Sequence, residues 1–235
     1  MVVVKTKSNE LKTRELRTVK KVQGYAGGFL LDIKPGIYKW LGDYDYSSLY
    51  PSIIRSLNLG IETLVGRIVI DEPTRNIWWG LSDLKNKDPK QEIEFEILDK
   101  ETYVLKTTKL TIGQLIKTIE SKKWTISANG VCFRTDERSI VASVLSDWFG
   151  MRKEYKKKME EANKNGDSVL EKLFDSQQHS FKILLNAVYG AFAINSWRFT
   201  DGYKIMSSAI TCSGQRMLIE SCKYTNEIID EKYMN

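Results

Sequence analysis

Apolar residues in the second half of the chain recur at helical spacing. The segment 137 to 193 is a long periodic stretch, interrupted only by the turn-like run NKNGD. After that run, Ser168 and Glu171 form an S-x-x-E pattern, which predicts a capping box at the start of a second helix. The first helix has an apolar stripe made of Val141, Val144, Leu145 and Trp148. We therefore expect two antiparallel helices joined by a tight connection, followed by a third helix at about 203 to 232.

The first half of the chain has shorter patterns. Between residues 66 and 135, five short runs (GRIVI, IEFEIL, TYVL, WTI and VCF) and one helical segment (TIGQLIKTIES) predict a small α+β region. An aromatic-rich run at 37 to 46 reads as a strand that follows two turn signals, Gly27-Gly28 and Pro35-Gly36. Residues 1 to 23 are polar and basic and read as a linker or tail without a fold of its own.

A helix start is predicted directly after the aromatic run. Pro51 suits the first turn of a helix and is followed by SIIRSL, so residues 47 to 50 lie at the helix N-terminus. The first backbone N–H groups of a helix have no acceptor within the helix. We therefore expect this segment to attract phosphate.

Composition narrows the classes of protein. With 42% hydrophobic and 28% charged residues, a folded core is expected. No apolar run reaches the length of about 18 residues of a membrane span, and MVVVKTK lacks the features of a signal peptide, so we expect no membrane partner and a cytoplasmic protein. The net charge of +6 suits an anionic partner without identifying one.

Cysteine and histidine usage bears on metals. The three cysteines form no CxxC pair, and His179 is the single histidine, which disfavours zinc and disulfide scaffolds. Any metal would then be held by oxygen atoms, which points to Mg²⁺ or Mn²⁺.

Polar side chains share helix faces with apolar ones in the predicted hairpin. Arg152 and Lys156 continue the apolar stripe of the first helix at i+4 steps, while Lys182, Asn186 and Tyr189 share one face of the second helix. The alternatives are a solvated charged face for RKEYKKK, a lysine whose stem lies along apolar surface at 182, and a core tyrosine at 189. Pairing of the helices directs the three cations toward a common cleft, which suits a triphosphate.

Two motifs resemble those of a known family. Residues 45 to 52 (DYSSLYPS) resemble the first palm motif of family B DNA polymerases, and residues 182 to 190 (KILLNAVYG) resemble their fingers motif, in the same order. Four further motifs are similar to the replicative polymerases of T4-like phages: YAGG at 25 to 28, SANGV at 127 to 131, RKEYK at 152 to 156 and AITCSGQ at 209 to 215. The resemblance covers the chain from about residue 24.

The resemblance implies a fold and an activity. The fold would be α+β, a partial palm of antiparallel sheet and helices with an antiparallel helical-hairpin fingers subdomain. The activity would be template-directed transfer of dNMP from dNTP to a primer 3′ end by a two-metal mechanism. The implied divisions are a tail at 1–23, palm at 24–136, fingers at 137–190 and further palm at 191–235.

The resemblance also implies roles for single residues. Asp45 and the backbone carbonyl of Tyr46 would bind magnesium, and the N–H groups of Ser48 and Leu49 would hold the β- and γ-phosphates. Tyr50 would lie under the sugar and exclude a ribose 2′-hydroxyl.

Further implied roles concern the triphosphate and the DNA. Arg152, Lys156 and Lys182 would hold the triphosphate, with Lys182 taking part in catalysis and Asn186 assisting. Residues next to the base pair or the DNA backbone would be Tyr189 and Gly190, and Tyr25, Gly27, Gly28, Thr211 and Gln215.

The sequence also departs from the family pattern. A second palm motif of the Tyr-Gly-Asp-Thr-Asp-Ser type is absent from the 235 residues, as are the exonuclease domain and the thumb. Asp43 falls where the family uses no carboxylate, and Asp99 and Glu101 are assigned no role. We therefore expect a polymerase part in a phage-infected bacterial cell that is inactive without a second polymerase fragment. The alternative is a non-catalytic nucleotide- or DNA-binding fragment, or a truncated remnant.

Overall fold

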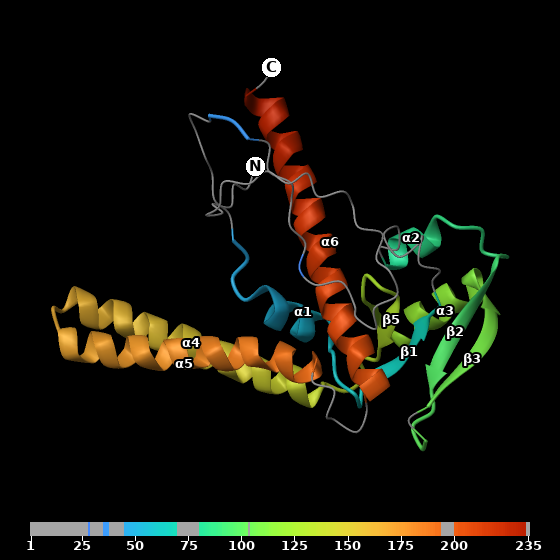
Figure 1. Cartoon of the computed structure of the whole chain (residues 1–235), viewed down its shortest axis with the longest axis horizontal. Coiled ribbons are helices and arrows are strands. Elements are labelled where there is room, and N and C mark those ends of the chain that lie inside the picture. The colour runs from blue at the N-terminus through green and yellow to red at the C-terminus, as the bar shows by residue number, and fades with distance from the viewer. Residues whose placement is uncertain are drawn as a thin grey trace.

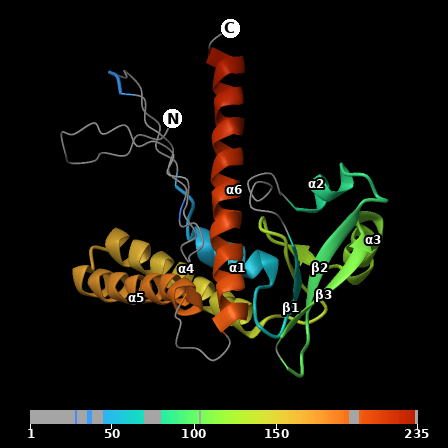
Figure 2. The same ribbon diagram turned by 45° about the vertical axis from the view of Figure 1, so that its right-hand side comes forward.

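The computed structural model describes residues 28, 35–37, 45–69, 80–102, 104–193 and 200–233. A small antiparallel sheet and a long helical hairpin lie on opposite sides of a short helix, and one long helix crosses between them (Figures 1 and 2). This arrangement confirms the predicted α+β fold class. The predicted linker at 1–23 and most of the strand predicted at 37–46 lie outside the described residues.

The sheet has five strands in the order β3-β2-β1-β5-β4, and every described pairing is antiparallel. The bounds of the strands are β1 Leu64–Ile68, β2 Glu92–Leu98, β3 Leu105–Thr111, β4 Thr125–Ile126 and β5 Val131–Phe133. The predicted run TYVL only touches the start of β3, whose remaining residues are largely polar because this edge strand is mostly exposed. That part of the prediction is wrong.

The described residues also form helices. Their bounds are α1 Leu49–Leu57, α2 Leu81–Lys85, α3 Ile112–Lys122, α4 Ile140–Lys164, α5 Ser168–Ala193 and α6 Thr200–Tyr233. The short α2 was not predicted. A capping box forms at α3, where Thr111 Oγ1 accepts from the Gln114 N–H and the Gln114 side chain accepts from the Thr111 N–H. No helix in the described ranges is both long and apolar enough to cross a bilayer.

Each face of the sheet packs on a separate core. Phe95 and Cys132 pack with the apolar side of α3, while Val131 and Phe133 pack with α1 and α6 on the other face. Neighbouring residues of β5 therefore point to opposite faces, as strand geometry requires. Leu64 and Ile68 of β1 are four residues apart and would share a face in a regular strand, but the register irregularity between Leu64 and Gly66 puts them in different cores.

The turn between β2 and β3 is organised by Asp99. Its Oδ1 accepts hydrogen bonds from the N–H groups of Glu101 (2.9 Å) and Thr102 (3.2 Å), and its Oδ2 lies 2.5 Å from Lys106 Nζ. The contact with Lys106 holds the pKa of the Asp99 carboxyl well below its ordinary range. Asp99 thus stabilises a tight turn.

Helices α4 and α5 form the predicted antiparallel hairpin, but its cap differs from the prediction. Oδ1 of Asp167 accepts from the N–H groups of Val169 (3.2 Å) and Leu170 (3.0 Å), so Asp167 caps α5 and Ser168 is already helical. The predicted capping box at Ser168 and Glu171 is wrong. The Glu171 carboxylate instead accepts from Asn163 Nδ2 at 2.6 Å, which ties the two helices together.

Asn58 joins the sheet region to the base of the hairpin. This residue is 3% exposed, and its Nδ2 donates to the carbonyls of Arg134 (2.8 Å) and Glu137 (2.7 Å). Its Oδ1 accepts from the Ser139 N–H at 2.9 Å, and Ser139 caps α4. The direction in which the hairpin leaves the core is therefore fixed at the end of α1.

Candidate active site

The start of α1 presents backbone donors rather than a closed cap. Ser48, the residue before the helix, has a left-handed backbone (φ 57°, ψ 52°), and its side chain makes no capping hydrogen bond. Pro51 in the first turn has no N–H, so the remaining donors without an intrahelical acceptor include those of Ser48 and Leu49. No acidic side chain lies in this turn. The helix end therefore suits an anion.

The hairpin brings cations to this helix end. Nη1 of Arg152 on α4 donates to Ser48 Oγ at 3.1 Å, and its Nε contacts Oε1 of Gln178 on α5 at 3.5 Å. Because α4 and α5 are antiparallel, Lys182 and Asn186 of α5 line the same cleft as Arg152 of α4. The Ser48 hydroxyl thus orients the arginine instead of capping the helix.

These elements enclose one cleft of about 460 Å³. It is lined by residues 45–50 together with Arg152, Lys182 and Asn186. The lining combines a carboxylate, two cations, an amide and a helix N-terminus, which is chemistry suited to a polyphosphate and a divalent cation. Parts that are more than 100 residues apart in the sequence meet there.

Tyr50 forms one wall of the cleft. Its ring centroid lies 4.6 Å from that of Tyr189 on α5, with 42° between the ring planes. A Cβ placed on Gly214 of α6 would lie 3.1 Å from Cε1 of Tyr50, and one on Gly28 would lie 3.7 Å from its hydroxyl oxygen. Three separate segments therefore position this ring.

Several residues predicted for the site lie elsewhere. Lys156 is exposed on α4 and does not line the cleft. Thr211 is 1% exposed, and its hydroxyl donates to the carbonyls of Ser207 (3.3 Å) and Ser208 (3.2 Å) within α6. Gln215 is half-buried on α6, and Gly190 is exposed on α5.

Three residues discussed for the site fall outside the described part of the chain: Tyr25, Gly27 and Asp43. The structure also adds two residues that sequence reasoning missed, Ser47 in the lining and Gln178 beside Arg152. Gln178 precedes Lys182 by one i+4 step, so the same helical spacing could have found it.

The groups around Asp45 offer oxygen atoms to a metal ion. Asp45 is the one carboxylate in the lining, and Tyr46 adds backbone and phenol oxygens. The Tyr46 hydroxyl is hydrogen-bonded to Ser221, which ties this segment to α6. All these donors are oxygens, as Mg²⁺ prefers, but the described ranges contain no group of three acidic, histidine or cysteine ligands. The oxygen donors of Asp45 and Tyr46 therefore match the ligand type that Mg²⁺ prefers, but further carboxylates are needed to complete its coordination.

Comparison with known proteins identifies the class to which this fold and site belong. The sequence model of "DNA polymerase family B" matches residues 1–235, and the chain belongs to that family. It is 32% identical over 206 residues to a DNA polymerase of Paramecium bursaria Chlorella virus NY2A, a match that covers 87% of this chain and 18% of the relative.

Other relatives come from different kinds of organism. The chain is 26% identical over 152 residues to a DNA-directed DNA polymerase of Escherichia phage RB69, covering 65% of this chain and 13% of that protein. It is 24% identical over 222 residues to DNA polymerase 1 of Sulfolobus acidocaldarius, covering 94% of this chain and 19% of that protein. The matched region is thus at most about a fifth of each of these relatives.

Proposed function

We propose that these 235 residues form the nucleotide-binding part of a DNA-directed DNA polymerase. The reaction is the template-directed transfer of dNMP from a dNTP to a primer 3′ end. The observation that carries the proposal is that Asp45, the start of α1, Arg152 and Lys182 line the same cleft. Family membership supports DNA synthesis in general, and the cleft chemistry supports the triphosphate as ligand.

The triphosphate is held in this proposal by groups of both regions. The N–H groups at Ser48 and Leu49 bind its β- and γ-phosphate oxygens, and Arg152 and Lys182 neutralise their charge. Asn186 adds a neutral donor. Lys156 reaches the ligand only if the hairpin moves toward α1, because it lies about 6 Å further along α4 than Arg152.

Tyr50 sets the sugar specificity and Tyr189 the position of the base. The Tyr50 ring lines the cleft next to the phosphate seat and is held from behind by Gly214. A ribose 2′-hydroxyl directed at this ring has no room, which favours a deoxyribose. Gly190, Gly28, Thr211 and Gln215, with Tyr25 and Gly27, are proposed to lie near the template or primer.

Two Mg²⁺ or Mn²⁺ ions complete the proposed mechanism. They would neutralise the developing charge on the phosphates during transfer. Asp45 and the Tyr46 carbonyl are the residues here that would hold them. A second aspartate motif must come from outside these 235 residues, either from further chain or from a second polymerase fragment that also brings the thumb.

The proposal also covers the kind of organism and the place in the cell. The motifs YAGG and SANGV resemble those of T4-like phages, so we propose a phage replicative enzyme acting in the cytoplasm of the infected bacterial cell. Primer-template DNA and dNTP are its proposed substrates.

Reconstitution tests the function. The chain is mixed with a separately purified segment that carries a Tyr-Gly-Asp-Thr-Asp-Ser-type motif and a thumb, and primer extension is measured with Mg²⁺ and dNTPs. Neither part alone is expected to extend the primer, whereas the mixture does. Asp45→Asn should abolish the activity of the mixture, while Asp147→Asn, an exposed acid on α4, should leave it unchanged.

Two outcomes would contradict parts of the proposal. Extension by the chain alone would exclude the need for a second carboxylate motif. A mixture that binds primer-template and dNTP yet never extends would favour the alternative, a binding fragment without catalytic function.

A further inference from the structure

A second cavity, of about 520 Å³, lies at the other end of α1 from the candidate active site. Its lining includes Val65, Ile97, Lys100, Lys122, Lys123 and Trp124, and it shares no residue with the first cleft. Thr125, next to Trp124, donates its hydroxyl to the carbonyl of Leu57, the last residue of α1. Helix α1 itself, with nine residues, is roughly 13 Å long.

The rim of this second cavity carries unbalanced positive charge. Lys100 comes from the turn after β2, while Lys122 and Lys123 come from the end of α3, and all three are exposed. None of them forms an ion pair within the described part of the chain. A lysine near a helix C-terminus is stabilised by the helix dipole, which accounts for the positions of Lys122 and Lys123 without an ion pair. This reason does not apply to Lys100.

Arg134 is different from these lysines. Its Nε lies 2.5 Å from Oδ1 of Asp136, and its Nη2 lies 3.5 Å from Oε2 of Glu137. The lining therefore has one neutralised arginine and three lysines available to an anionic ligand.

The wall of the cavity is aromatic and apolar. The Trp124 ring is half-buried and lies nearly parallel to Phe95, with 6.5 Å between ring centroids and 15° between planes. Ile97, which also lines the cavity, is 44% exposed. An indole that lines one cavity together with three lysines is a combination that can bind an unpaired nucleotide, with the base on the ring and phosphates on the cations.

We propose that this cavity is a single-stranded DNA site distinct from the candidate active site. Its volume of about 520 Å³ falls in the range of about 300–1,000 Å³ typical of small-ligand sites, which suits a single nucleotide. An acidic peptide would satisfy the lysines but would leave the flat face of Trp124 without a matching group. The site would hold an unpaired stretch of template or primer away from the cleft.

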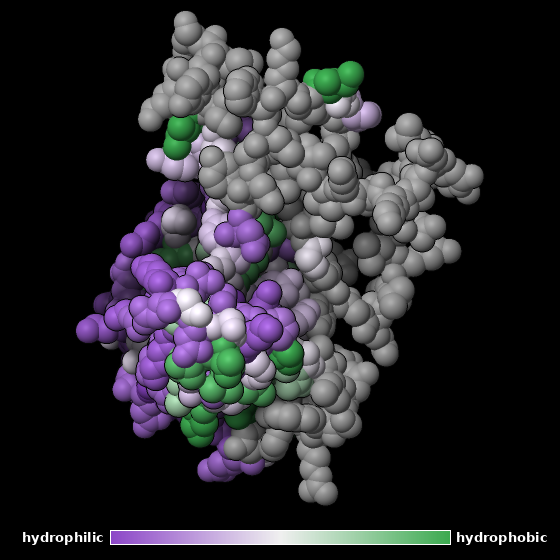
Figure 3. All heavy atoms as spheres, turned by 90° about the vertical axis from the view of Figure 1, so that its left-hand side faces the viewer, coloured by the Kyte–Doolittle hydropathy of each residue, from purple (hydrophilic) through white to green (hydrophobic). Residues whose placement is uncertain are grey.

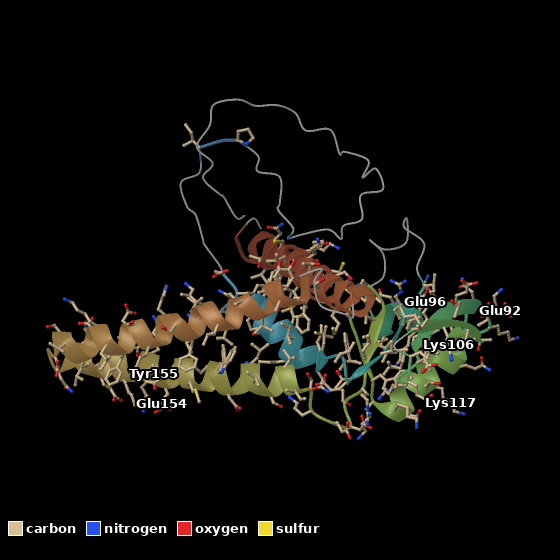
Figure 4. All side chains as sticks on the ribbon, turned by 60° about the horizontal axis from the view of Figure 1, so that its bottom comes forward. Glu92, Glu96, Lys106, Lys117, Glu154 and Tyr155 are labelled. Carbon is tan, nitrogen blue, oxygen red and sulfur yellow. The ribbon has the colours of Figure 1, made fainter. Side chains whose placement is uncertain are left out.

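Anisotropy of a labelled oligo(dT), measured on the whole 235-residue chain without Mg²⁺ or dNTP, tests the proposal. The double variant Lys122→Gln/Lys123→Gln should lower affinity roughly tenfold and reduce the slope of log K against log salt by about 1.4, since each lost phosphate contact removes about 0.7 for single strands. The matched control is Lys90→Gln/Lys117→Gln, two exposed lysines of the same region (Lys117 in Figure 4), which should change affinity less than about threefold.

The aromatic part has its own variant. Trp124→Leu should weaken oligo(dT) binding by about 5- to 150-fold, the range for loss of one base stack. If this variant fails to fold, the Lys122→Gln/Lys123→Gln variant still tests the proposal, because exposed lysines do not pack in the core. Equal losses in the pocket and control pairs would overturn the proposal. So would displacement of oligo(dT) by polyglutamate at equal charge concentration, or a loss of binding confined to Lys182→Ala.

Discussion

The helical hairpin and the sheet region bury their apolar side chains in different ways. The sheet has a core on each face, and all three residues of β5 are buried. In the hairpin, the buried side chains among those described are Ala142, Leu145, Ala162, Leu185 and Phe192, and all but Ala162 lie at the end that meets the core. The hairpin is therefore anchored at one end and solvated along most of its length.

The free end of the hairpin makes this difference visible. Figure 3 views the molecule toward that end, where a mostly hydrophilic surface includes an apolar area. Val169 (76% exposed), Leu170 (41%) and Leu173 (49%) are the exposed apolar residues at the start of α5. Figure 4 shows Glu154 and Tyr155 on α4, and Tyr155 stacks on Phe181 of α5 at 5.8 Å. Contacts between α4 and α5 hold this part together.

The candidate site lies where the hairpin leaves the core. Arg152 and Lys182 sit between the anchored end and the free end, next to the start of α1. The start of α1 packs on the core, and Arg152 and Lys182 belong to the two helices that Leu145 and Leu185 anchor to that core. A change at the anchor should therefore alter stability, whereas a change in the middle should alter ligand binding.

The largest contrast is expected between the two ends of the hairpin. Leu145→Ala removes a fully buried side chain from the core and should lower the free energy of unfolding by about 2–5 kcal/mol. Leu173→Ala, at the half-exposed end, should change it by less than about 0.5 kcal/mol. Urea unfolding followed by circular dichroism measures both, and similar losses would mean that the free end is packed in solution.

Asn58 tests the joint between the two regions. Asn58→Ala deletes both donors to the carbonyls of Arg134 and Glu137 and leaves alanine with a φ of 56°, so a loss of about 2–4 kcal/mol is expected. Asn58→Gly tolerates that backbone and should recover about 1 kcal/mol of the loss. The same urea titration gives the free energy of unfolding of both variants. Wild-type stability in either variant would mean that Asn58 does not hold the two regions together.

Much of this organisation could be predicted from spacing, because helices α4, α5 and α6 repeat apolar residues at helical intervals. Lys156, which follows the same i+4 spacing, does not line the cleft. Each i+4 step turns about 40° around the helix, so two steps from Trp148 rotate a side chain about 80° from the starting face. The role of Asn58 could not be predicted, because its partners lie 76 to 81 residues away and nothing local marks them.

The next largest effect is expected from a substitution in the candidate active-site cleft. Lys182→Ala removes a charge-assisted contact worth about 1.5–3 kcal/mol, so incorporation efficiency in the reconstituted enzyme should fall roughly 10- to 150-fold. Lys172→Ala, an exposed lysine earlier on α5, is the matched control and should have no effect. Steady-state single-nucleotide incorporation measures both. Equal rates for Lys182→Ala and the wild type would remove this residue from the site.

The smallest effect concerns the glycine behind Tyr50. An alanine is a better helix former than glycine by about 0.8–1.0 kcal/mol, and at Gly150 of α4 an added Cβ meets nothing within 4 Å, so Gly150→Ala should stabilise the protein by about that amount. At Gly214 the new Cβ would lie 3.1 Å from Tyr50 Cε1, and the strain of overpacking, about 1–3 kcal/mol, should cancel or reverse that gain.

A shift of the Tyr50 ring would also change the shape of the cleft, so the Gly214 variant can be tested by its sugar preference as well as by its stability. Ile53 and Leu49 lie 3.5 and 3.6 Å from the new Cβ, so the added methyl group has little free space, and we expect it to push the Tyr50 ring away from α6 and farther into the cleft that this ring lines. Gly214→Ala should therefore raise the preference for dNTP over NTP in the reconstituted enzyme, whereas Gly150→Ala should not change it. Stabilisation by both alanines, with unchanged sugar preference, would mean that Gly214 does not position Tyr50.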